Sequence, residues 1–120
     1  MPKSVTIYHN PRCGKSRATL ELLEAHEEAP IVINYLEKPP SATELRRILK
    51  LLKMKPRDLM RKHEEPYAKL KLDNPKLSDA ALVKAMVENP ILIERPIVVA
   101  NGKAAIGRPP ESVLEILQGG

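Results

Sequence analysis

Residues 8–17 read Tyr-His-Asn-Pro-Arg-Cys-Gly-Lys-Ser-Arg and contain the only cysteine of the chain. The rest of the predicted fold is built around this stretch. An apolar run with Val5 and Ile7 precedes it, and a helix-like run over 18–23 follows. Cys13 is therefore expected where a strand turns into a helix N-terminus, a place where free backbone N–H groups and the helix dipole favour an anion. A thiolate is such an anion. The first hypothesis is a nucleophilic cysteine of low pKa beside a bound oxyanion.

The composition narrows the class of protein. The 120 residues carry a net charge of +5 and are 42% hydrophobic, without Phe or Trp. A chain of this length is expected to form one domain. A single cysteine excludes an internal disulfide and a cysteine-rich zinc site, and it fits a reducing cytoplasm. No apolar run has the length of a signal peptide or a membrane span. The basic residues are interleaved with Glu and lack aromatic neighbours. This pattern disfavours nucleic acid as the binding partner and leaves a small anionic substrate as the alternative.

The first part of the chain has the pattern of a βαβ unit. We expect a strand at Ser4–Tyr8, a helix from Gly14 to about Glu28, and a second strand at Ile31–Leu36. Two strands joined in this way are expected to be parallel, with a right-handed crossover.

The middle of the chain, about residues 40–90, is expected to be a helical insert rather than an independent domain. The expected elements, in order, are a helix capped by Ser41 and Glu44, a short helix opened by Pro56, an irregular connection over residues 64–75, and a helix capped by Ser78 or Asp79 and ended by Asn89-Pro90.

The last part of the chain predicts strands and a closing helix. The expected strands are Ile91–Ile93, Ile97–Val99 and Lys103–Ile106, and the helix starts at Pro109-Pro110. Asn101-Gly102 is a strong signal for a two-residue hairpin. The predicted fold is therefore α/β and thioredoxin-like, βαβ…ββα with a helical insert between the two halves, in a single domain over residues 1–120.

Several neighbours could lower the pKa of Cys13. The cationic candidates in the stretch are His9, Arg12, Lys15 and Arg17. A buried, inert cysteine is the alternative, but the Asn10-Pro11 pair and Gly14 make a poor core segment. His9 could pair electrostatically with the thiolate or merely cap the turn, and the sequence leaves both open.

Ser16 stands where dithiol redox proteins carry their second cysteine. A resolving thiol must therefore come from another molecule, such as glutathione or a partner protein. Simple polarity at a helix start explains Ser16 equally well. The phosphatase-type loop Cys-x5-Arg would need an arginine where this chain has Thr19. The other histidines have no metal-ligand spacing, so neither a metal nor a bound cofactor is expected.

Three arginines outside the stretch are candidates for holding an oxyanion: Arg61, Arg95 and Arg108. Arg95 precedes Pro96 between two expected strands, where such a bond is commonly cis and faces the cysteine turn, although an ordinary trans proline is the alternative. Arg108 precedes Pro109 at a helix entrance. A single arginine is more often solvated, but guanidinium groups suit tetrahedral oxyanions, and three that converge would hold a dianion tightly.

Five stretches of the chain together resemble the glutaredoxin-dependent arsenate reductases. They are Tyr8-His9-Asn10-Pro11-x-Cys13-Gly14-x-Ser16-Arg17, Tyr35-Leu36-Glu37-x-Pro39-Pro40, Leu59-Met60-Arg61-Lys62 with Glu65-Pro66-Tyr67, Pro90-Ile91-Leu92-Ile93-x-Arg95-Pro96-Ile97-Val98-Val99, and Arg108-Pro109. The resemblance covers essentially the whole chain, in order.

The resemblance implies an oxidoreductase of arsenic detoxification that reduces arsenate to arsenite. Carried over residue by residue, Cys13 attacks arsenic and His9 helps to lower the pKa of Cys13. The residues that hold the oxyanion would be Arg61, Arg95 and Arg108, with Ser16, Arg17 and Pro96 in supporting positions. Glutathione would attack the Cys13–arsenic adduct, and glutaredoxin would complete the reduction. We expect a cytoplasmic monomer that binds no cofactor, nucleic acid or membrane.

Three other functions share parts of this pattern. A general glutathione-linked thiol oxidoreductase would use Cys13 without needing the arginines. Spx-type regulators bind RNA polymerase and carry a Cys-x-x-Cys switch, where this chain has Ser16. Monothiol glutaredoxins hold an iron–sulfur cluster, and Lys15 in place of an apolar residue argues against that reading.

Overall fold

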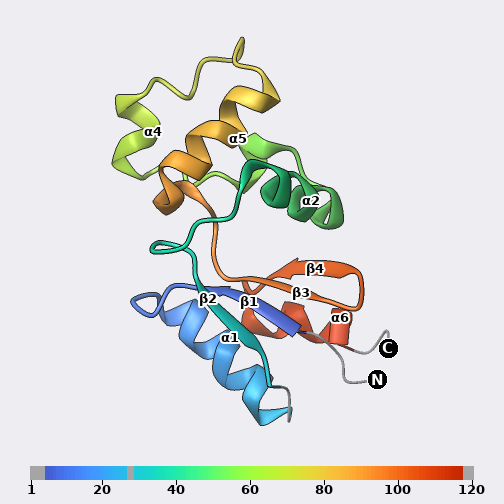
Figure 1. Cartoon of the computed structure of the whole chain (residues 1–120). Coiled ribbons are helices and arrows are strands. Elements are labelled where there is room, and N and C mark those ends of the chain that lie inside the picture. Colours follow the sequence, from blue (N-terminus) through green and yellow to red (C-terminus); the bar gives the residue numbers. More distant parts are fainter. Residues whose placement is uncertain (1–4, 27–28, 118–120) are drawn as a thin grey trace. The chain divides into compact units, whose positions relative to one another are not determined.

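The computed structural model describes residues 5–26 and 29–117. The chain forms two compact units. The sheet unit consists of Met1–Lys38 with Arg95–Gly120, and the helical unit consists of Pro39–Glu94. Each unit is described by itself (Figure 1).

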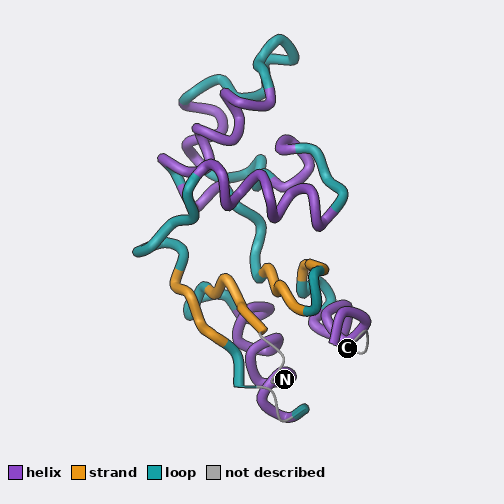
Figure 2. Tube along the Cα trace, turned by 45° about the vertical axis from the view of Figure 1, so that its right-hand side comes forward, coloured by secondary structure: helices purple, strands orange, loops and turns teal. Residues whose placement is uncertain are grey.

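The sheet unit holds four strands in the order β2-β1-β3-β4 (Figures 1 and 2). Its elements are β1 (Val5–His9), α1 (Gly14–Ala25), β2 (Ile31–Asn34), β3 (Ile97–Ala100), β4 (Lys103–Ile106), the 3-10 turn η2 (Pro110–Val113) and α6 (Leu114–Leu117). β1 is parallel to β2 and antiparallel to β3, and β4 is antiparallel to β3. The predicted thioredoxin-like order, βαβ followed by ββα, is confirmed.

The β3–β4 hairpin follows from its two turn residues. Asn101 and Gly102 have φ angles of 55° and 72°, the positive values that a two-residue hairpin of this twist requires. The Asn101 side chain also donates a hydrogen bond of 2.8 Å to the carbonyl of Ile116. The turn is thereby tied to α6, and the predicted hairpin is confirmed.

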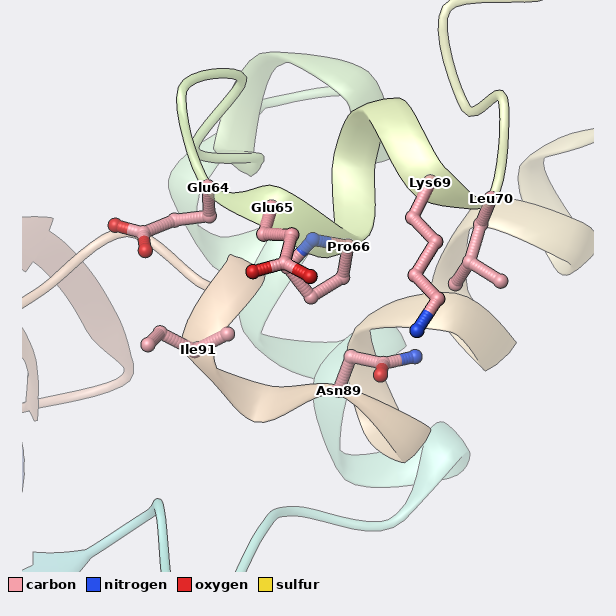
Figure 3. A pocket seen from close by; sticks show the side chains of 7 residues that line it. All are labelled: Glu64, Glu65, Pro66, Lys69, Leu70, Asn89 and Ile91. Carbon is pink, nitrogen blue, oxygen red and sulfur yellow. The ribbon is translucent and has the colours of Figure 1, made fainter.

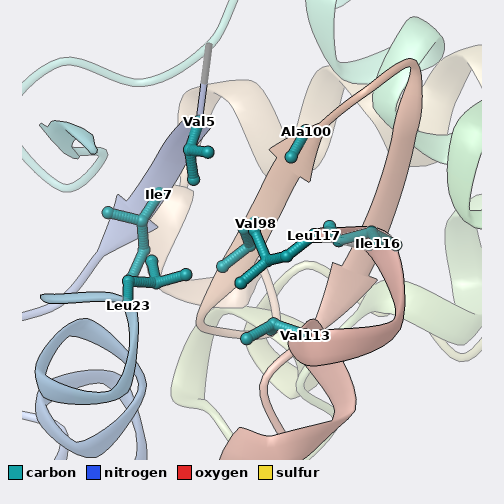
Figure 4. Packing of buried hydrophobic residues seen from close by; sticks show 8 residues of the cluster. All are labelled: Val5, Ile7, Leu23, Val98, Ala100, Val113, Ile116 and Leu117. Atoms are coloured by element: carbon teal, nitrogen blue, oxygen red, sulfur yellow. The ribbon is translucent and has the colours of Figure 1, made fainter. Parts of the chain in front are cut away.

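One face of this sheet packs against α1, η2 and α6 (Figure 4). Alternate residues of two strands point to this face, as the period of a strand requires: Val5 and Ile7 from β1, Val98 and Ala100 from β3. The helices contribute Leu23, Val113, Ile116 and Leu117. Each fully buried aliphatic side chain stabilises the fold by about 1.5–3 kcal/mol. This core packs β1 against α1, the two elements between which Cys13 lies.

The helical unit contains α2 (Ala42–Leu52), α3 (Pro56–Leu59), α4 (Glu65–Lys69), α5 (Asp79–Glu88) and the 3-10 turn η1 (Pro90–Leu92). Two serine caps begin its longer helices as predicted. Ser41 Oγ accepts the backbone N–H of Glu44 at 3.1 Å, and Ser78 Oγ accepts that of Ala81 at 3.1 Å. Among the described residues, no helix is both long enough and apolar enough to cross a membrane.

Two predictions for this unit are wrong. Residues 64–75 are not irregular throughout, because they contain α4, whose five residues are too few to show a helical period. The strand expected at Ile91–Ile93 is a 3-10 turn followed by a single bridge between Ile93 and Met60. The apolar run there reflects the burial of Leu92 and Ile93 together rather than the alternation of a strand.

The element ends also differ in places. α1 ends at Ala25 instead of about Glu28, and Glu28, like Ser4, lies outside the described residues. β2 ends at Asn34 instead of Leu36, because the Asn34 carbonyl accepts two backbone N–H groups, from Glu37 and Lys38, and turns the chain.

Candidate active site

Cys13 occupies the N-cap position of α1, with φ −98° and ψ 123°, and it is buried. The turn before the helix is fixed by backbone hydrogen bonding: Cys13 N–H donates to the Asn10 carbonyl at 3.0 Å, and the Asn10 side chain accepts the N–H of Arg12 at 3.0 Å. At the N-cap, a side chain faces the open N–H groups of the first helical turn. The strand-to-helix turn therefore directs the sulfur toward those donors.

The surroundings of Cys13 favour its thiolate. Burial raises the pKa of the thiol, but three groups together outweigh this effect: the backbone N–H of Ser16, the side chain of Arg95, and the backbone N–H of Lys15. The positive charge of Arg95 adds to its hydrogen bonding, and the pKa of Cys13 lies below its ordinary value. The thiolate is the nucleophilic form of cysteine.

Two arginines from the C-terminal part of the chain reach this thiol. Besides Arg95, Arg108 places its Nη2 3.7 Å from Cys13 Sγ. Arg108 Nε also donates a 2.8 Å hydrogen bond to the carbonyl of Arg95, so the two arginine segments are joined. The Arg95–Pro96 bond, whose isomer the sequence left open, is cis, and so is the Arg108–Pro109 bond. The Cys13 sulfur and two guanidinium groups thus lie together in one site that favours the thiolate.

Gly107 allows the Arg108 segment to approach Cys13, and nothing in the sequence singled it out. Its N–H donates to the Pro96 carbonyl at 3.0 Å. A Cβ on Gly107 would lie 2.4 Å from Thr19 Oγ1 and 2.8 Å from Pro96 Cγ, distances that no side chain could keep. Only glycine lets the segment leading to Arg108 lie this close to α1.

His9 contacts Ser16 rather than the sulfur. Its Nδ1 lies 2.6 Å from Ser16 Oγ, and the same oxygen accepts the backbone N–H of Asn10 at 3.0 Å. Burial lowers the pKa of His9, which favours the uncharged form of the ring. An effect of His9 on Cys13 would therefore pass through the hydrogen bonds of Ser16, whose N–H faces the thiol, and not through a positive charge.

Ser16→Ala is expected to destabilise the chain by about 1–3 kcal/mol, because it leaves the buried Asn10 N–H and the His9 ring without this partner. Urea unfolding measures the effect. Thr6→Ala, at a half-buried strand position, is the comparison for losing a hydroxyl group in the same sheet unit. A Ser16→Ala protein as stable as the wild type would show that the serine hydroxyl does not hold the turn.

The remaining predicted residues are placed as follows. Arg17 is exposed on α1, and its backbone N–H donates to the Cys13 carbonyl at 3.0 Å, while Pro96 is buried. Arg61 lies in the helical unit, where it forms ion pairs with Glu64 and Glu94. Within residues 5–26 and 29–117, no group of three or more His, Cys, Asp and Glu side chains is placed to hold a metal ion.

The sheet unit brings together Cys13, His9, Ser16, Arg95, Pro96 and Arg108. Asn10, Thr19, Gly107 and the two carboxylates beside Arg61 were not singled out from the sequence. The Asn-Pro pair before the cysteine was a usable signal for Asn10. The others act through contacts between distant segments, which no local pattern indicates.

The order of strands and helices, with one cysteine at the start of α1, defines a thioredoxin-like protein with a single cysteine. The model of the ArsC family matches residues 8–116, and the chain belongs to the ArsC family. An arsenate reductase of Haemophilus influenzae is 55% identical, over 95% of this chain and 99% of its own length. The uncharacterized protein YfgD of Escherichia coli K12 is 58% identical, over 98% of this chain and 99% of its own. The solved structure of an arsenate reductase from Vibrio cholerae, 56% identical, matches with a TM-score of 0.94 over 97% of this chain and 99% of that one.

Proposed function

We propose that this protein is an arsenate reductase that converts arsenate to arsenite through a Cys13–arsenic intermediate, with glutathione and glutaredoxin as reductants. The observation that carries the proposal is the Cys13 thiol of lowered pKa with the Arg108 guanidinium 3.7 Å from its sulfur. A thiolate beside two arginines suits attack on a tetrahedral oxyanion, which the guanidinium groups would hold and polarise. The arsenate reductases among its relatives support the choice of arsenic.

The reaction balances with two external thiols. Cys13 thiolate attacks As(V), and one arsenate oxygen leaves as water after protonation. Glutathione displaces a second oxygen and forms an As–S bond. A glutaredoxin thiolate then attacks the glutathione sulfur, so that the two thiols end as a mixed disulfide and arsenic accepts two electrons. Water then replaces the Cys13 sulfur on As(III), so that arsenite is released as As(OH)3 and Cys13 returns as the thiolate. The chain has no second cysteine, so the resolving thiols are supplied by other molecules.

The other predicted residues have defined roles in this scheme. Arg61, Arg95 and Arg108 hold the oxyanion. His9 and Ser16 keep the first turn of α1 aligned with Cys13 through their 2.6 Å contact. Arg17 and Pro96 support the cysteine turn and the Arg95 segment. The monomeric state and the cytoplasmic location stay predictions from the sequence.

Arsenite formation by the purified protein tests this function. We expect arsenite only when glutathione and glutaredoxin are both present, and complete loss of activity in Cys13→Ser, because a serine hydroxyl is not ionised at neutral pH. Arg12→Gln, an exposed change beside the nucleophile, is the matched control and should remain active. Activity in Cys13→Ser, or no arsenite from the wild type with both reductants, would contradict the proposal.

A further inference from the structure

Arg61 has two carboxylate partners within the helical unit. Its Nε lies 3.3 Å from Glu64 Oε2, and its Nη1 lies 3.2 Å from Glu94 Oε1. The three side chains are only 22%, 25% and 28% exposed, so solvent screens them less than an ordinary surface pair. One positive and two negative charges leave the trio with a net negative charge. This is an unusual setting for an arginine that is to bind an anion.

The backbone holds this trio in place. Met60 and Ile93 form an antiparallel bridge, in which Arg61 N–H donates to Leu92 at 2.7 Å and Glu94 N–H donates to Leu59 at 2.9 Å. Arg61 and Glu94 each directly follow a residue of this bridge, so the bridge holds their backbones next to each other.

Glu64 is brought to Arg61 by the next turn of the chain. The Glu64 N–H donates to the Arg61 carbonyl at 3.3 Å. Glu64 also lies at the rim of a pocket of about 510 Å³, and Figure 3 shows its side chain pointing away from Lys69, which lies across the pocket beside Asn89. Lys69 is therefore not placed to neutralise the Glu64 carboxylate in place of Arg61.

We infer that Glu64 and Glu94 are specificity-determining residues for an oxyanion bound at Arg61: they compete with the oxyanion for the Arg61 guanidinium and disfavour dianions more than monoanions. The inference rests on the proposed function in taking Arg61 as an oxyanion ligand. A guanidinium offers five N–H donors in one plane, and the two carboxylates already occupy its Nε side and one Nη1 direction. A tetrahedral anion that binds Arg61 through two N–H groups must therefore displace one of the carboxylates or use the N–H groups that the carboxylates leave open.

The charge dependence follows from Coulomb's law. The repulsion between the carboxylates and a ligand scales with the ligand's charge, so removing one carboxylate should tighten the binding of a dianion by about threefold to tenfold. For a monoanion of the same shape, the factor should be the square root of that gain. Loss of a carboxylate therefore changes the preference between anions as well as their affinity.

Sulfate and perchlorate provide the test, since both are tetrahedral and they carry two charges and one. Their dissociation constants are measured by NMR titration at fixed ionic strength for the wild type, Glu64→Gln and Glu94→Gln. Glu65→Gln is the matched control, because it removes a carboxylate from the same turn and, in the part of the chain described, Glu65 has no ion pair with Arg61. The same Glu64→Gln change is repeated in an Arg61→Gln background. Thermal unfolding shows that each variant is folded.

We expect tighter sulfate binding in Glu64→Gln than in Glu65→Gln and a smaller gain for perchlorate. The gain for sulfate should be clearly smaller when Arg61 is absent, because only the direct repulsion between the carboxylate and the anion then remains. Equal effects of Glu64→Gln and Glu65→Gln, weaker sulfate binding in Glu64→Gln, a gain that is equally large without Arg61, or no sulfate binding by any variant would each overturn the inference. Arsenite formation by the wild type is measured separately. A protein that shows the predicted sulfate pattern without making arsenite keeps this inference and refutes the proposed function, whereas arsenite formation with an unchanged sulfate affinity does the reverse.

Discussion

Gly107→Ala is expected to lower the free energy of unfolding by about 1–3 kcal/mol, the usual cost of forcing an extra carbon into a packed interior. The added methyl group would lie 2.4 Å from Thr19 Oγ1 and 2.8 Å from Pro96 Cγ, so one of these buried residues must move. Thr19 cannot turn away freely, because its hydroxyl donates to the Lys15 carbonyl at 2.8 Å. Urea unfolding measures the loss.

The same substitution should also slow arsenite formation by about a hundredfold, because a shift of about 1 Å in a positioning group is enough for such a loss. Gly107 directly precedes Arg108, whose Nη2 lies 3.7 Å from the Cys13 sulfur. Gly14→Ala is the control for stability, since its Cβ would meet only Arg17 Nη2 at 3.9 Å. We expect Gly14→Ala to be at least as stable as the wild type. A Gly107→Ala protein with wild-type stability and activity would show that the close approach of this segment is not needed.

Arg95→Gln is expected to raise the pKa of Cys13 and to reduce arsenite formation at pH 7 by about a hundredfold, the usual cost of removing one donor from an oxyanion site. The direction of this change in the pKa of Cys13 follows from the groups around the thiol. Burial raises the pKa of this thiol, and Arg95 opposes burial through both its hydrogen bonding and its charge. Without Arg95, the equilibrium between the thiolate and the thiol of Cys13 therefore shifts toward the thiol. Each unit of increase costs about tenfold in the thiolate population at a pH below the pKa.

The pH dependence of Cys13 alkylation by iodoacetamide measures this change. We expect the midpoint of the Arg95→Gln profile to move to higher pH and the rate at pH 7 to fall. Part of the lost rate should return at alkaline pH, where the thiol ionises without help. Arg12→Gln removes the same charge from an exposed position next to the nucleophile, and its midpoint should not move. If both variants moved the midpoint equally, general charge rather than the position of Arg95 would explain the low pKa.

Local signals were sufficient for most of the sheet unit. Asn101-Gly102 encodes the hairpin by itself, because few other pairs accept two positive φ angles. The apolar alternation in β1 and the single cysteine before a helical period placed Cys13 at its turn. Ser41 and Ser78 likewise marked the starts of two helices in the helical unit.

The prediction failed where a distant contact decides the structure. Ile91–Ile93 has the composition of a strand, yet Leu92 and Ile93 are both buried, and the segment forms a 3-10 turn with one bridge to Met60. α4 is too short to show a period, and its buried residue is a single tyrosine, Tyr67.

The same limit applies to the candidate site. Arginines near a cysteine motif can be nominated from the sequence. The partners of these arginines cannot be predicted from the sequence. Arg108 is placed beside Cys13 by the close approach of Gly107 to α1 and by the hydrogen bond from Arg108 to the Arg95 carbonyl, and both are contacts between distant segments. Nor does any pattern in the sequence indicate that Arg61 lies between two carboxylates.

The folded chain lowers the pKa of Cys13 at the start of α1 and so favours its thiolate. The most direct test is the titration of Cys13 in the wild-type protein, followed by the thiolate absorbance in the ultraviolet, with the urea-unfolded chain as the reference. The chain has one cysteine, so the signal belongs to one group. We predict that the pKa of Cys13 in the folded protein lies clearly below that in the unfolded chain, because the N–H groups of Ser16 and Lys15 and the side chain of Arg95 outweigh burial. Equal pKa values in the two states would contradict the account.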